Sequence, residues 1–125
     1  MRTIIALAML LTASVANAQQ VQTGAGIGTC GQFAQDYQQG GSQAEKIYFA
    51  WAQGYMTGYN QQWIISQILE RPNGEPAYRD LDTLSQEKQL ASIRTYCNAH
   101  PLDKYADAVG HLLISLPIRH LPIQK

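Results

Sequence analysis

The stretch that decides the fold is residues 44–70, AEKIYFAWAQGYMTGYNQQWIISQILE. Its apolar and aromatic side chains recur every three or four residues, which is the spacing of one face of an α-helix. The stripe consists of Ala44, Ile47, Tyr48, Trp51, Tyr55, Gly58, Tyr59 and Trp63. Because Ser42 with Glu45 three residues later is typical of a helix start, we expect one long helix that ends near Glu70.

Two glycines, Gly54 and Gly58, lie four residues apart inside this helix. A glycine in a helix interior costs about 1 kcal/mol relative to alanine. The pair therefore predicts that another helix, or the aromatic rings of the first helix, approaches the backbone closely at this point.

Three shorter helices are expected around the long one. Residues 29–39 place Cys30, Phe33, Ala34 and Tyr37 on one helical face, and Gly40 and Gly41 end that segment. After a loop at 71–81 with an Asn-Gly turn signal, a third helix is expected over 84–98, capped by Asp82 or Thr83. A fourth helix is expected to begin at Pro101 and to end before Pro117.

These patterns predict an all-α fold, a small four-helix domain over residues 29–117 that is closed by a disulfide. We find no useful run of strand-like alternation. Residues 19–28 are expected to form a flexible leader and residues 118–125 a flexible tail.

The first 18 residues have the pattern of a secretory signal peptide. Arg2 is followed by the short apolar run Ile4 to Leu11 and by the A-x-A site at 16–18, so cleavage is expected after Ala18. The alternative is a retained amphipathic anchor. No later segment is apolar for long enough to span a membrane, so no membrane insertion is expected after cleavage.

Charge excludes one class of partner. After residue 18 the chain carries eight Lys and Arg against nine Asp and Glu, without a basic cluster. A nucleic-acid-binding protein presents such a cluster to phosphates, so we expect no nucleic-acid partner.

The two cysteines, Cys30 and Cys97, are interpreted as a disulfide, because an exported chain with an even cysteine count favours one. Closing a loop of this length is worth about 4 kcal/mol in the chain-entropy model. The alternative is a metal or redox pair, and the absence of a C-x-x-C motif disfavours redox catalysis.

Asp103, Asp107 and His111 are the strongest candidates for chemistry, because a helix would place two carboxylates and an imidazole on one face. The alternative is a solvated face with a weak Asp107–His111 pair. No nucleophile elbow or phosphate loop is present in the sequence. We therefore expect a non-enzyme and assign no catalytic, cofactor-binding or metal-binding residue.

The aromatic stripe supplies the candidate partner-binding residues, which are Trp51, Tyr55, Tyr59 and Trp63. Aromatic side chains with a polar tip are enriched at protein interfaces. Core packing is the alternative and is favoured for Trp51 and Tyr55. Tyr59 and Trp63, which lie beside Asn60, Gln61 and Gln62, are the better candidates for an exposed patch.

Three segments together resemble the small periplasmic acid-stress chaperones of the HdeA/HdeB type. The segment 29–33 is similar to their T-C-x-x-F opening, 51–58 to the helix W-x-x-G-Y-x-x-G, and 96–101 to the segment Y-C-x-x-[NH]-P. The resemblance implies a helical periplasmic protein with a Cys30–Cys97 disulfide. It also implies a dimer at neutral pH that dissociates in acid and holds unfolded client proteins soluble. The 71–81 loop and the tail depart from that pattern.

A second resemblance is to immunity proteins of the Rap1a/Tai4 type, which are also small, exported, helical and disulfide-bonded. That resemblance implies tight docking to one specific protein partner instead of many clients. Both resemblances leave the client or partner open.

Overall fold

The computed structural model describes residues 24–122. The expected signal peptide, residues 19–23 of the expected leader and the last three residues lie outside this range. The described chain forms η1 (Gly24–Ile27), α1 (Cys30–Glu70), β1 (Ala77–Arg79), α2 (Gln86–Ala99), α3 (Tyr105–Ser115) and β2 (Ile118–His120). The fold is therefore mostly helical, as the sequence predicts.

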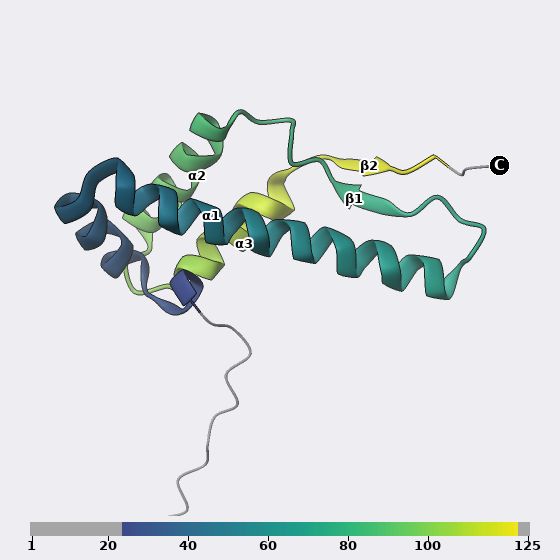
Figure 1. Ribbon diagram of the computed structural model, residues 1–125, viewed down its shortest axis with the longest axis horizontal. Helices are drawn as coiled ribbons and strands as arrows, with labels where there is room; N and C mark the ends of the chain where they lie inside the picture. The colour runs from purple at the N-terminus through teal and green to yellow at the C-terminus, as the bar shows by residue number, and fades with distance from the viewer. Residues whose placement is uncertain (1–23, 123–125) are drawn as a thin grey trace, which may run out of the picture.

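The two helices expected at 29–39 and 42–70 are the two halves of α1. Gly41 has a φ of 57° and a ψ of −140°, a conformation that glycine adopts readily, and the helix folds back on itself there (Figure 1). Thr29 caps the first half by accepting a hydrogen bond from the Gln32 amide. Across the kink, the Tyr48 hydroxyl donates to the Asp36 carboxylate at 2.6 Å. The described residues thus contain three α-helices instead of the expected four.

The other two helices begin later than expected. α2 begins at Gln86 because Ser85, not Asp82 or Thr83, caps it. α3 begins at Tyr105 rather than at Pro101, because the Asp107 carboxylate accepts a hydrogen bond from the Lys104 amide and so completes the first turn there.

The core lies between the middle of α1, α2 and α3. Phe33, Tyr48 and Tyr105 pack their rings against one another, with centroids 4.9 to 5.0 Å apart. The rest of the core consists of Cys30, Phe49, Ala52, Met56, Ile93, Cys97, Ala108, Val109, Leu112, Leu113 and Leu116. Within it, the Cys30–Cys97 disulfide predicted from the sequence ties the start of α1 to α2.

The expectation that the described part of the chain contains no strand is wrong. β1 pairs antiparallel with β2, and Ala77, Tyr78 and Arg79 face His120, Arg119 and Ile118. Residues 118–120, which were expected in a flexible tail, are held by this pairing and by the hydrogen bond from the Leu121 amide to the Pro76 carbonyl. The strands were missed because three residues are too few to show alternation.

The described end of the expected leader is also packed. Residues 24–27 form the short 3-10 helix η1, which packs on the Trp51 indole. Gly26 of this helix is buried against the indole ring. A Cβ atom at Gly26 would overlap the indole ring, so only glycine permits this contact.

Candidate functional site

The most distinctive surface lies at the end of the molecule away from η1. The second half of α1 extends beyond α2 and runs beside β1 and β2, as Figure 1 shows. We call α1 from Tyr59 to Glu70, together with β1 and β2, the arm.

Two amide side chains hold the strand of the arm against its helix. The Asn60 side chain donates to the Arg79 carbonyl and accepts from the Arg79 amide, each at 2.8 Å. One heptad later, the Gln67 side chain does the same with Ala77, at 2.9 Å for both bonds. The edge of β1 that faces α1 is therefore paired by side chains, while the other edge pairs with β2.

Arg79 joins the arm to the rest of the fold. Its guanidinium lies 5.9 Å from the centroid of the Trp63 ring, and its Nη1 donates to the Leu116 carbonyl at the C-terminus of α3. Tyr59 also packs on Trp63, with its ring centroid 6.0 Å from that of Trp63. Trp63 therefore contacts both a cation and an aromatic ring, and these contacts fix its position.

The outer face of the arm helix carries three exposed apolar side chains. Ile65 is 50% exposed, Ile68 45% and Leu69 77%, and these three residues follow one another along one helical face. No charged residue occurs between Lys46 and Glu70. Exposed apolar side chains that gather without charges mark a surface suited to contact with other proteins.

The four predicted partner-binding residues do not form one patch. Trp51 and Tyr55 stack on each other at 5.2 Å and border the core, where Trp51 also contacts η1 and Tyr105. Only Tyr59 and Trp63 lie on the arm, where Tyr59 is 42% exposed and Trp63 is half-buried. The four residues point in different directions because each step of four residues rotates the side chain by about 40° around the helix axis.

The prediction of close approach at Gly54 and Gly58 is wrong for the described part of the chain. A Cβ atom at either position would meet nothing within 4 Å. The sequence pattern also did not identify Ile65, Ile68 and Leu69 as an exposed face, nor Asn60 and Gln67 as clamps. The seven-residue spacing of Asn60 and Gln67 is visible in the sequence, but the strand that these two residues hold is not.

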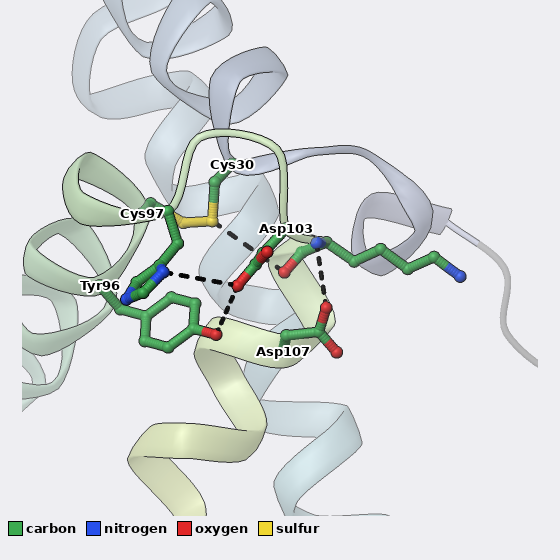
Figure 2. A network of polar contacts seen from close by, with 7 residues as sticks. Cys30, Tyr96, Cys97, Asp103 and Asp107 are labelled. Atoms are coloured by element: carbon green, nitrogen blue, oxygen red, sulfur yellow. Dashed lines mark hydrogen bonds and ion pairs between the residues drawn. A yellow bond between two sulfur atoms is a disulfide. The ribbon is translucent and has the colours of Figure 1, made fainter.

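The residues considered for metal binding are instead used in the junction between α2 and α3. Figure 2 shows the Asp103 carboxylate beside Tyr96, whose hydroxyl donates a hydrogen bond to it at 2.8 Å. His100 Nδ1 lies 3.8 Å from the same carboxylate. The Asp107 carboxylate caps α3. Within residues 24–122 no three His, Cys, Asp or Glu side chains are grouped so that they could hold a metal ion.

The same junction anchors the start of α1. The amide of Cys30 donates to the Asp103 carbonyl and that of Gly31 to the Pro101 carbonyl, both at 2.8 Å. The hydrogen bond to Asp103 raises the pKa of the Tyr96 phenol above its usual value. The ring of Tyr96 also packs between the imidazoles of His100 and His111, with centroid distances of 4.5 and 5.1 Å. This packing indicates a structural role for the junction.

Comparison of the chain with known protein families, curated protein sequences and solved structures finds no significant match. The resemblances to the chaperones and to the immunity proteins therefore stay predictions. Among residues 24–122, no helix combines the length and the apolar character that a membrane span requires.

Proposed function

We propose that this protein is a non-enzymatic, periplasmic protein-binding protein that acts as an HdeA/HdeB-like acid-stress chaperone. It is exported by the signal peptide expected at residues 1–18 and holds unfolded client proteins soluble. The observation that supports this function best is the exposed apolar face of the arm, which is formed by Ile65, Ile68 and Leu69. Unfolded clients expose apolar segments, and burial of apolar area stabilises such contacts by about 25 cal/mol per Å².

The absence of charge on this face suits contact with clients in acid. A client becomes strongly positive when its carboxylates are protonated, and a positively charged face would repel it. The face belongs to the stretch between Lys46 and Glu70, and this stretch contains no Lys, Arg, Asp or Glu side chain. Its affinity for apolar client segments therefore does not depend on its own protonation.

The test is aggregation of an acid-unfolded client, followed by light scattering as the pH falls from about 7 to about 2. The protein is expected to suppress scattering in acid, and the Ile65→Ser/Leu69→Ser double variant is expected to lose more than half of that protection. Leu102→Ser is the matched control, because Leu102 is 89% exposed but lies in the turn between α2 and α3, far along the chain from the arm.

Two outcomes would contradict the proposal. Either the wild type fails to suppress scattering at any pH, or the arm variant and Leu102→Ser lose protection equally. Light scattering of the protein alone, recorded in the same titration, also tests the dimer that the resemblance implies.

A second candidate function is that of an immunity or inhibitor protein of the Rap1a/Tai4 type. The observation that favours it is the fixed arrangement of the arm, in which Asn60, Gln67 and Arg79 leave few side chains to be ordered on binding. A preformed surface of this kind lowers the entropic cost of docking to one folded partner. One stoichiometric protein partner at neutral pH, together with no client protection in acid, would favour this function over the first.

A further inference from the structure

The amides that hold β1 belong to a series of three along α1. Gln53, Asn60 and Gln67 are spaced by seven residues, so they lie within about 40° of one another and about 10.5 Å apart along the helix. Asn60 and Gln67 each pair with both backbone groups of one strand residue. Gln53, by contrast, is exposed and makes no hydrogen bond within residues 24–122.

The strand does not extend as far as Gln53. β1 runs opposite to α1, since Ala77 lies at Gln67 and Arg79 at Asn60. The Asp80 amide still donates to the Pro117 carbonyl, which continues the pairing beside β2, and the chain then leaves α1 toward α2 (Figure 1). The position that a longer strand would occupy beside Gln53 is therefore not filled by β1 itself.

A cleft of about 420 Å³ lies at this position, between α1 and the segment that leads into α2. The part of its lining that matters here consists of Gln53, Met56, Leu81, Asp82, Leu84 and Gln89. Its volume is within the range of pockets that bind small ligands or short peptides.

The wall of the cleft opposite α1 is fixed. The side-chain amide of Gln89, which is only 6% exposed, donates to the Leu81 carbonyl at 2.8 Å and to the Leu84 carbonyl at 2.9 Å. Leu81 and Leu84, which are half-buried, contribute apolar surface to the same cleft. The cleft therefore combines the side-chain amide of Gln53, an apolar surface and a wall that is held by hydrogen bonds.

We propose that this cleft binds an extended peptide segment of another protein, whose backbone pairs with Gln53 as β1 pairs with Asn60 and Gln67. One N–H and one C=O of the peptide bond to the Gln53 amide, and a small apolar side chain contacts Leu84. Among residues 24–122, Asp82 is the only charged side chain that lines the cleft, so the segment is neutral or basic. This site is distinct from the apolar face of the arm and does not depend on the function proposed for that face.

The test is an NMR titration with a capped pentapeptide of alanine and valine that carries one lysine. We expect shifts of the Gln53 side-chain amide and the Leu84 methyl groups, and a Gln53→Met variant that binds about tenfold more weakly. Methionine keeps the length of the side chain but lacks its hydrogen bonds. Gln62→Met is the matched control, because Gln62 is an exposed glutamine on a different face of α1.

A second probe isolates the backbone pairing. The same peptide with its central amide N-methylated lacks one donor and is expected to bind to the wild type more weakly than the parent peptide does. Three results would overturn the proposal: no shifts with the parent peptide up to about 10 mM, equal binding by Gln53→Met, or equal binding of the methylated peptide. None of these results depends on client protection in acid, which tests the face at Ile65 and Leu69.

Discussion

At the scale of single residues, Tyr48 shows how one polar group stabilises the kink in α1. Its hydroxyl donates to Asp36 in the other half of the helix, while its ring packs on Phe33 and Tyr105. Burial, together with the hydrogen bond to Asp36 and its negative charge, raises the pKa of Tyr48 to about 12. The hydrogen bond from Tyr48 in turn lowers the pKa of Asp36 below its usual value.

The raised pKa of Tyr48 predicts how stability changes in alkaline solution. The folded pKa lies above the unfolded value of about 10, so the contribution of Tyr48 is fully present below pH 10 and is lost between about pH 10 and about pH 12. We expect the free energy of unfolding to fall over this window and Tyr48→Phe to make that fall shallower. Burial also raises the pKa of Tyr105, so part of the fall remains.

Urea unfolding followed by circular dichroism at several pH values measures this slope. Tyr59→Phe, which changes an exposed tyrosine on the arm, is the control and is expected to keep the wild-type slope. An unchanged slope in Tyr48→Phe would show that the bond across the kink does not contribute to the alkaline loss of stability.

At the scale of elements, the two-stranded sheet depends on a helix for one of its edges. An isolated pair of three-residue strands has marginal stability in water. Here the Asn60 and Gln67 amides pair with the inner edge of β1, and Arg119 forms an ion pair with Asp80 at 3.1 Å. We therefore expect β1, β2 and the end of α1 to form and open together as one unit.

Asn60→Leu tests this coupling because leucine has a similar volume and no amide. The variant leaves the Arg79 backbone groups without their partners, and we expect a loss of about 1–3 kcal/mol in the free energy of unfolding. In hydrogen exchange, the amides of β1 and β2 are expected to lose protection while those of α2 and α3 keep it. Gln62→Leu is the control. Full protection of the Arg79 amide in Asn60→Leu would show that the Asn60 side chain does not hold β1 in place.

At the scale of the whole molecule, the disulfide closes a long loop covalently. It links Cys30 to Cys97 across 67 residues, and that loop contains all of β1, nearly all of α1 and most of α2. The partly buried Arg94–Glu45 ion pair connects α1 and α2 a second time. Together these links hold the two helices around the core.

Removal of the disulfide by Cys30→Ala/Cys97→Ala is expected to lower the free energy of unfolding by about 4 kcal/mol. That loss is a large fraction of the stability of a domain of this size. Urea unfolding of the oxidised wild type and of the double variant measures the difference. A loss below about 1 kcal/mol would mean that the junction hydrogen bonds, not the disulfide, anchor the start of α1.

The sequence by itself determined the helical fold class, the disulfide and the approximate extent of the helices, because periodicity, caps and cysteine pairing are local or composition-based signals. It also marked Gly40 and Gly41 as a break, and the structure has a kink at Gly41. Tertiary structure alone decided which faces of α1 are buried. The two short strands, the packing of Gly26 on Trp51 and the cleft at Gln53 likewise required it. Each of these features depends on contacts between segments far apart in the chain, which no local pattern records.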